Sequence, residues 1–165
     1  MQVLRASDVR FLPLWKKLTS GCVRERLALY GEANLAYYRE YAGGGEAQDR
    51  SFLILDGELP IVGVRMFQHQ LADTSYQLSC WSLPILYLEH ADSSADSRTG
   101  AHKVLKGEFK EIVGAPGAPD RVYYRDHLDR SELSCPGRVL LDLGAQPVPG
   151  FTQVIDLTCP EEELH

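Results

Sequence analysis

Two short stretches of the sequence gather side chains that could bind or transform a small molecule. The first runs from Tyr76 and Trp81 through Tyr87 to the polar residues Glu89 and His90. Strand ends that lead into polar loops are frequent ligand sites in proteins that contain a sheet. The alternative is that the aromatic residues are core and that the loop after them is only solvated.

The second stretch is Tyr123–His127, at the end of a predicted strand. Alternation along a strand would direct Tyr124 and Asp126 to one side, and Arg125 and His127 to the other. A strand end that becomes a charged surface turn would explain the same residues.

Arg65 interrupts an apolar run between Val64 and Met66. A charged side chain in such a strand must reach solvent, a carboxylate or an anionic ligand. The planar guanidinium suits bidentate binding of carboxylate or phosphate. Both an edge-strand salt bridge and a substrate contact therefore remain open for Arg65.

Other kinds of site lack their usual spacing. No pair among the five histidines and four cysteines has the short separation of a tetrahedral zinc site, so we expect no metal. No GxSxG motif surrounds Ser75, Ser79, Cys80 or Cys135, although a base brought close by folding would not be visible in a sequence. Residues 43–45 are three glycines before a predicted strand, which indicates a linker rather than a phosphate loop.

Length and composition predict one globular domain of 165 residues with a formal net charge of −6. This acidic balance provides no strong nucleic-acid footprint. No apolar run approaches the ~20 residues of a membrane span, and Arg5 and Asp8 interrupt any signal peptide. The four separated cysteines predict free thiols and a cytoplasmic location.

Local patterns predict the elements that would position these residues. Asp56-Gly57 between two apolar runs, Ser51–Leu55 and Pro60–Gln68, predicts a hairpin. The spacing of apolar residues predicts helices that contain Val9, Leu12, Trp15 and Leu18, then Arg24–Tyr41, and then Arg98–Val113. The further expected strands are Gln2–Arg5, Tyr76–Trp81, Ile85–Leu88, Arg121–Tyr124, Val139–Leu143 and Phe151–Leu157. This order predicts an α+β fold with a mixed, mostly antiparallel sheet covered by helices.

The Arg98–Val113 helix has one apolar face, so we expect it to lie on the sheet. Its predicted buried residues are Val104, Leu105, Phe109 and Ile112, and its predicted outward residues are His102, Lys103, Lys106 and Lys110.

Several segments, in this order, resemble the amino-terminal half of the Fem-type aminoacyl- and acyltransferases of the GNAT superfamily, the group of FemA, FemB and FemX. They are the hairpin Arg50–Val64, the strand Trp81–Leu86, the helix Arg98–Val113 and the strand and capped helix start Thr152–His165. The segment Leu83-Pro84-Ile85 departs from the family because it lacks the adjacent glycine of the family's loop.

The resemblance implies that residues 1–165 form one GNAT-like lobe, the amino-terminal half of a two-lobe N-acyltransferase. It implies transfer of an acyl or aminoacyl group to an amine-bearing acceptor, such as a cell-wall or polysaccharide precursor. Acyl-CoA or aminoacyl-tRNA would be the donor, and no cofactor would be tightly bound. Without the second half we expect no turnover by the lobe alone, and self-association into a homo-oligomer.

The resemblance also suggests which residues contact the acceptor. Arg65 would bind an anionic group, Trp81 and Tyr124 would shape the site, and Glu89 or His90 would hydrogen bond to the amine. The alternative function is a non-catalytic GNAT-like domain that binds a small molecule or a protein partner.

Overall fold

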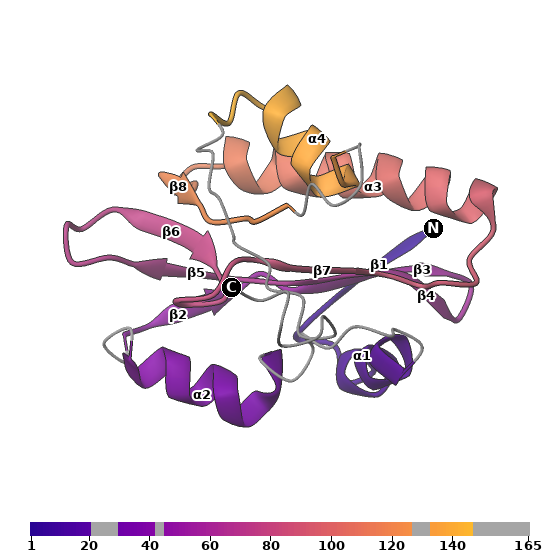
Figure 1. Ribbon diagram of the computed structural model, residues 1–165, viewed down its shortest axis with the longest axis horizontal. Coiled ribbons are helices and arrows are strands. Elements are labelled where there is room, and N and C mark those ends of the chain that lie inside the picture. Colours follow the sequence, from indigo (N-terminus) through magenta and orange to yellow (C-terminus); the bar gives the residue numbers. More distant parts are fainter. Residues whose placement is uncertain (21–29, 42–44, 127–132, 147–165) are drawn as a thin grey trace, which may run out of the picture.

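The computed structural model describes residues 1–20, 30–41, 45–126 and 133–146. Within them, two sheets lie next to each other with helices on both sides (Figure 1). The first sheet has the order β1 (Gln2–Arg5), β3 (Phe52–Asp56), β4 (Leu59–Arg65) and β7 (Leu86–Glu89). The second has the order β2 (Ala47–Asp49), β5 (Phe67–Gln70), β6 (Tyr76–Ser79) and β8 (Arg121–Val122). Only the β6–β8 pair among these strands is parallel, so the predicted α+β class with mostly antiparallel strands is confirmed.

The hairpin predicted around Asp56-Gly57 is present as β3 and β4. Asp56 pairs with Leu59, and Gly57 has a φ of 59°, which a residue without a Cβ adopts at little cost. The Asp56-Gly57 turn that the sequence predicts is therefore the turn that connects β3 and β4.

The predicted strand Pro60–Gln68 is wrong as a single element, because it divides at Met66 into β4 and β5 of different sheets. The backbone of Met66 bonds to residues that precede β3 instead of continuing a ladder. Its N–H donates to Ser51 Oγ at 3.0 Å, and its carbonyl accepts from Arg50 N at 3.1 Å. The apolar pattern does not change at this residue, so it could not indicate the change of sheet.

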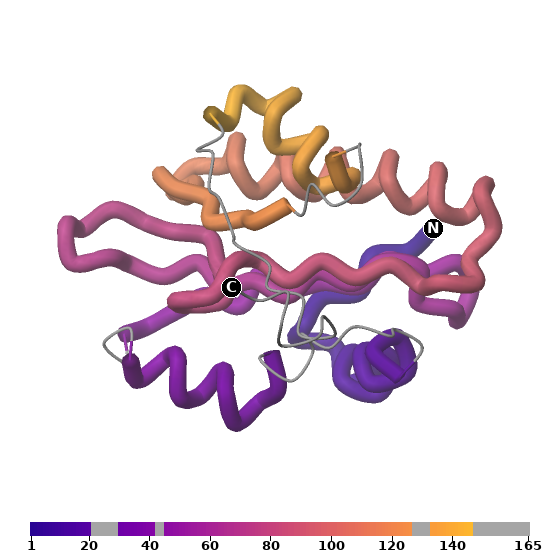
Figure 2. The backbone as a smooth tube through the Cα atoms, viewed as in Figure 1, coloured from indigo at the N-terminus to yellow at the C-terminus, as the bar shows by residue number. Residues whose placement is uncertain are grey.

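Two helices cover one side of the sheets, and α1 packs closely there (Figure 2). In α1 (Phe11–Ser20), Phe11 and Leu18 are buried, whereas Val9, which precedes the helix, is 91% exposed. The predicted face is thus wrong at Val9, because the helix begins only after the Asp8 turn, where Phe11 N donates to Asp8 O at 2.9 Å. In α2 (Glu32–Tyr41) the helix begins after Gly31, while residues 21–29 of the predicted Arg24–Tyr41 helix lie outside the described residues.

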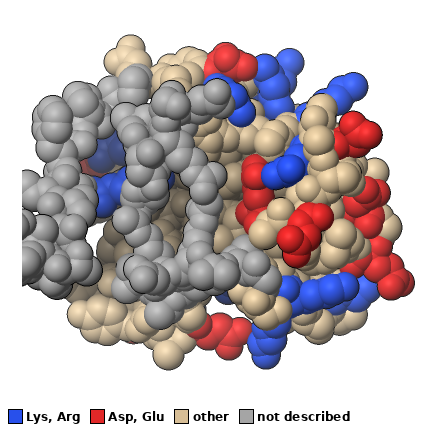
Figure 3. Space-filling view, turned by 45° about the vertical axis from the view of Figure 1, so that its right-hand side comes forward, with Lys and Arg blue, Asp and Glu red and all other residues tan. Residues whose placement is uncertain are grey.

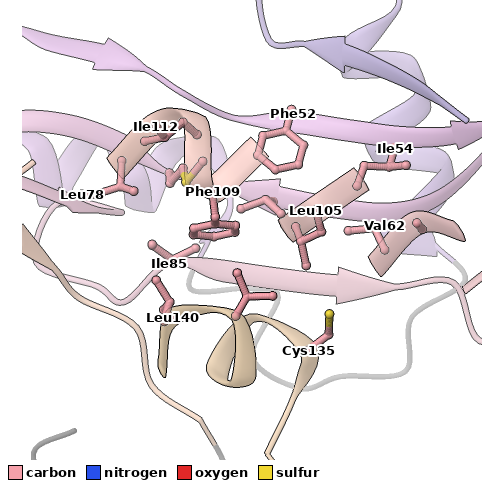
Figure 4. Packing of buried hydrophobic residues seen from close by; sticks show 14 of the residues in the cluster. Phe52, Ile54, Val62, Leu78, Ile85, Leu105, Phe109, Ile112, Cys135 and Leu140 are labelled. Atoms are coloured by element: carbon pink, nitrogen blue, oxygen red, sulfur yellow. The ribbon is translucent and has the colours of Figure 1, made fainter. Parts of the chain in front are cut away.

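The helix α3 (Ala95–Gly114) covers the other side of the sheets and confirms the expected amphipathic helix. Its N-cap is Ser94, whose side chain accepts a hydrogen bond from Ser97 N at 3.0 Å. Its buried residues are Ala101, Leu105, Phe109 and Ile112, whereas Val104, which is predicted to be buried, is only partly buried. Figure 4 shows Phe109 and Leu105 among residues of the sheet and of the next helix.

That next helix, α4 (Cys135–Asp142), replaces the predicted strand Val139–Leu143, which is wrong. The side chain of Ser134 caps its first turn by accepting from Gly137 N at 3.2 Å, and Pro136 fits that turn because it needs no N–H there. Val139 and Leu140 pack into the same core as Phe109. A short apolar run is compatible with either a buried strand or a helix. Here the packing of residues 135–142 against α3 favours the helix. The predicted strand Phe151–Leu157 and the capped helix start after it lie outside the described residues.

The first sheet therefore separates two apolar clusters, one under α3 and α4 and one under α1. The contact with α1 is very close at Gly63, where a Cβ would lie 2.5 Å from Leu18 Cδ2 and 2.8 Å from Trp15 Cζ3. No helix in the described ranges is long and apolar enough to cross a membrane. On the face shown in Figure 3, basic and acidic side chains are interspersed.

Candidate functional site

The residues predicted to form one site are divided by the first sheet. Along β7, Leu86 and Leu88 pack in the cluster under α1, whereas Tyr87 packs in the cluster under α3 and α4. Glu89 has the same parity as Tyr87 and hydrogen bonds to it. Arg65 on β4 lies instead on the α1 side, next to Trp15.

Arg65 is the last residue of β4, and its guanidinium lies between two aromatic rings. Its Cζ is 5.9 Å from the ring centroid of Trp15 and 5.6 Å from that of Phe67. Its Nε is buried and finds no hydrogen-bond partner among the described residues. A buried donor without an acceptor costs free energy, so an anionic ligand that reached this atom would recover it.

Beside Arg65 is a hollow of about 280 Å³. We call it the Arg65 hollow. Its apolar walls come from α1 and α2, and its charged groups come from α2, from the end of β2 and from β4. The apolar residues are Phe11, Leu12 and Leu35, and the charged residues are Glu32, Asp49 and Arg65. Two carboxylates and one guanidinium around apolar walls match a small molecule that carries both an ammonium and an anion.

Trp81 connects to Arg65 through Phe67. The rings of Phe67 and Trp81 are stacked with centroids 5.5 Å apart, and Arg39 Cζ lies 5.9 Å from the Trp81 ring. Trp81 is only 6% exposed and has a φ of 62°, which is uncommon for a bulky residue. Trp81 therefore packs against Phe67, the ring that contacts Arg65. It has little exposed surface of its own for a ligand.

Glu89 belongs to a second group of side chains, on the α3 side. Its Oε1 is 2.6 Å from His102 Nε2 on α3, and the Tyr87 hydroxyl donates to the same carboxylate oxygen. Cys135, the first residue of α4, contributes to the electrostatic surroundings of His102. We call Tyr87, Glu89, His102 and Cys135 the His102 cluster. The expectation that His102 points outward is therefore wrong.

The hydrogen bonds of the His102 cluster determine its charges. The side chain of Cys135, followed by the bond with Glu89, raises the pKa of His102 to about 9. The bond with His102 lowers the pKa of Glu89 below its usual value, against the effect of burial. Burial raises the pKa of Tyr87 far above its usual value, so this hydroxyl stays neutral. Near neutral pH, Glu89 and His102 are thus an ion pair.

The remaining two predicted residues differ in their relation to this cluster. Tyr124 Oη lies 2.6 Å from Oγ of Ser134, the N-cap residue of α4, which places Tyr124 next to Cys135 along the helix. His90 opens the turn before α3: its N–H donates to Ile61 O at 2.8 Å, and its Nδ1 accepts from Asp92 N at 3.3 Å. The structure thus brings Arg65 and Trp81 together on one side, and Glu89 and Tyr124 on the other.

His102 and Cys135 are not among the candidate site residues predicted from the sequence. A signal for His102 was present, because it lies one helical turn before buried Leu105 and two turns before buried Phe109. The signal for Cys135 was the Ser-Cys-Pro sequence, which starts a helix. Neither pattern indicates that the two side chains belong to one cluster, because they lie on different elements.

Cys80 and Cys135 are free thiols, while Cys22 and Cys159 lie outside the described residues. In the part of the chain that the structure describes, no three His, Cys, Asp or Glu side chains are arranged to hold a metal ion.

No protein-family model matches the chain, and no curated protein and no solved structure matches it significantly.

Proposed function

We propose that this chain is a lobe of a Fem-type, GNAT-like N-acyltransferase that holds the amine-bearing acceptor and does not catalyse transfer alone. The Arg65 hollow is the observation that carries the proposal. It combines a buried guanidinium Nε without a partner among the described residues and two carboxylates within one small volume.

The charges of the hollow suit an acceptor that has an ammonium group and an anionic group. Arg65 would bind the carboxylate or phosphate, because its Nε is the buried donor that lacks an acceptor. Glu32 and Asp49 would hold the ammonium, and Asp49 is fixed by accepting from Ser51 N at 2.8 Å. The apolar wall from Phe11 and Leu35 would contact the carbon chain between the two charges.

Direct attack of an amine on an acyl donor needs orientation and a proton acceptor, and it needs no covalent nucleophile. The carboxylates of the hollow can accept a proton, whereas Arg65, the cation of the hollow, is assigned to the anionic group of the acceptor. A second lobe would then have to supply the donors for the developing oxyanion together with the site for acyl-CoA or aminoacyl-tRNA. The proposal places the protein in the cytoplasm, as a homo-oligomer or joined to its second lobe, with a cell-wall or polysaccharide precursor as acceptor.

Ligand binding tests the proposal directly. Trp15 and Trp81 are the only two tryptophans of the chain, and both flank the Arg65–Phe67 stack. Their fluorescence can therefore follow titration with lysine, 4-aminobutyrate and glucosamine 6-phosphate, with calorimetry as a second measurement. We expect Arg65→Gln to weaken binding at least about tenfold, since a charge-assisted hydrogen bond contributes about 1.5–3 kcal/mol.

Arg121→Gln is the matched control, because Arg121 is also a strand arginine but lies in the second sheet and pairs with Asp73 at the surface. It should leave binding unchanged. Absence of binding by the unmodified chain, or equal effects of the two variants, would refute the proposal.

A non-catalytic binding domain is the second candidate function, and the same hollow favours it because its one guanidinium would be used to bind the anionic group of the ligand. Release of free CoA from acetyl-CoA, with the best-bound amine as acceptor, separates the two when the assay uses the full reading frame. A basic helix and about 150 further residues downstream, the size of a second domain, with turnover, would establish the enzyme. A bound amine without turnover in the full reading frame would establish the binding domain.

A further inference from the structure

The helix α2 forms one wall of the Arg65 hollow but buries little of its own surface. It lies on the same side of the sheets as α1 (Figure 1), and it contributes Glu32 and Leu35 to the hollow. Of the ten residues of α2, all of which are described, only Leu35 is buried. Leu35 belongs to neither of the two apolar clusters, whereas Phe11 and Leu18 of α1 both pack in the cluster under α1. A helix with so little buried apolar surface separates from the protein at low cost in free energy.

Contacts near the two ends of α2 reach the same short segment between β6 and β7. Tyr30, which lies just before the helix, donates its hydroxyl to the backbone carbonyl of Pro84 at 3.1 Å. In the last turn, Arg39 Cζ lies 5.9 Å from the ring centroid of Trp81. Neither contact is part of a strand ladder, so α2 can leave the hollow without breaking the pairing of either sheet.

A row of cationic and aromatic side chains connects α2 to the guanidinium of the hollow. It begins with Arg39 over Trp81, whose ring is stacked on that of Phe67 with centroids 5.5 Å apart. The Phe67 centroid is in turn 5.6 Å from Arg65 Cζ. The position of α2 and the position of the Arg65 guanidinium therefore depend on the same pair of rings.

We propose that α2 is a lid that opens to admit a ligand to the Arg65 hollow and closes when the ligand is bound. The inference rests on the proposed function, because the ligand is the amine-bearing acceptor. With its anion on Arg65 of β4 and its ammonium on Glu32 of α2, one ligand molecule links the helix to the sheet. Glu32 and Leu35 belong to the site only in the closed state, so the ligand binds that state more tightly and shifts the population toward it.

Opening of the lid is measurable because α2 does not remain helical once it leaves the protein. It has ten residues, and isolated helices shorter than about 12–15 residues are marginal in water. The amides of an open α2 therefore exchange with solvent, and mass spectrometry of the full chain follows this hydrogen exchange peptide by peptide. Without ligand, we expect peptides from α2 to exchange at least about tenfold faster than peptides from α1.

Ligand should slow the exchange of α2 by increasing the closed population. The probes are lysine, 4-aminobutyrate and glucosamine 6-phosphate, each at about ten times the dissociation constant from the titration above. If only the closed state binds, this excess should slow the exchange of α2 about tenfold. Peptides from α3, on the opposite side of the sheets, should keep their rates.

Glu32→Gln separates binding from closure. Binding through Arg65 should persist at lower affinity, but the same excess of amine should slow the exchange of α2 less than about threefold, because the ligand then distinguishes the two states less.

Arg39→Gln tests the contact with Trp81, which lies outside the hollow. Without ligand it should speed the exchange of α2 about two- to fivefold, the effect of an exposed cation–π contact. Glu40→Gln is the matched control, because Glu40 is also exposed near the end of α2, and removal of an acidic charge there does not weaken the helix.

The outcomes separate the lid from the proposed function. Equal exchange of α1 and α2 in the chain without ligand would overturn the lid. So would an amine that binds and leaves the exchange of α2 unchanged, although the proposed function would then stand. Failure of all three amines to bind would refute the proposed function, and the lid with it.

Discussion

Arg65 and Glu89 lie on two paired strands, β4 and β7, but their side chains leave the sheet on opposite faces. On the α1 face, Arg65 stands beside a hollow with a buried Nε that has no acceptor in the described structure. On the α3 face, Glu89 has His102 and Tyr87 as partners. One face keeps an unused donor beside open space, which suits a binding site, and the other uses its polar groups internally.

The apolar clusters on the two faces of the first sheet also differ in size and packing. The cluster under α3 and α4 is the larger, with Phe52, Phe109 and Leu140 among its members. The cluster under α1 depends on the close approach of Leu18 to Gly63. We therefore expect substitutions on the α3 face to have the larger effect on the free energy of unfolding. Substitutions on the α1 face should mainly change the shape of the Arg65 hollow.

Phe109→Ala tests the dominance of the α3 face and should have the largest effect. Phe109 is fully buried in the middle of the main cluster, so we expect a loss of about 3–5 kcal/mol in the free energy of unfolding. Lys110→Ala, next to it but exposed on α3, should change stability by less than about 0.5 kcal/mol. Urea unfolding of both variants gives the comparison, and similar midpoints would contradict this account of α3.

Gly63→Ala tests the α1 face. A Cβ at this position would lie within 3 Å of atoms of Leu18 and Trp15, so α1 must shift or the core must strain. Overpacking of this kind costs about 1–3 kcal/mol. Because Trp15 contacts Arg65, the substitution should also weaken amine binding. Unfolding and ligand titration of the same variant check both expectations, with Gly107→Ala, in open space on α3, as control.

Glu89→Gln tests the internal pairing on the α3 face through its pH dependence. The pKa of His102 is raised from 6.5 to about 9, so its contribution to stability is full below pH 6.5 and is lost as the pH rises through 9. The lowered pKa of Glu89 adds stability above 4.5 that is lost on acidification. The substitution should therefore cost about 1–3 kcal/mol near pH 5.5–6.5.

Above pH 9 the difference between Glu89→Gln and the unmodified chain should become small. Thermal unfolding from pH 5 to pH 10 measures it. A difference that is constant across this range would mean that the ion pair contributes nothing that depends on the charge of His102.

Asp142→Asn should have the smallest effect. Its carboxylate forms an ion pair with Lys106 at 2.5 Å between α4 and α3, but both side chains are more than half exposed. Such pairs contribute about 0–1 kcal/mol and weaken with salt. Unfolding at low and high salt should reveal at most a slight difference, whereas a large one would assign the α3–α4 contact to surface charge rather than to the core.

The sequence predicted those elements that are determined by interactions between residues close together in the chain. The Asp56-Gly57 turn and the apolar face of α3 were identified, because turn residues and helical spacing act over a few residues. The helix α4 was predicted as a strand, since its fate depends on packing against α3. The change of sheet at Met66 was not visible either, because it depends on bonds to Arg50 and Ser51 from another part of the chain.

The candidate site shows the same division. Arg65 and Glu89 could be selected as candidates from the sequence, because a charge in or next to an apolar strand is visible within one segment. Their separation onto two faces was not, since it depends on the parity of β4 and β7 within a common sheet. The partner of Glu89, His102, is contributed by a different element, α3, and no local pattern indicates that these two side chains meet.

The parallel pairing of β6 with β8 has a consequence for the order of folding. Gln77 pairs with Arg121, so this contact closes a long loop that contains β7 and all of α3. The β3–β4 hairpin needs only its own short turn. Closing long loops costs entropy before any contact compensates for it, so distant pairings form late. Pulsed hydrogen exchange during refolding should therefore protect the amides of β3 and β4 first, and the second sheet should acquire β8 only after α3 has docked.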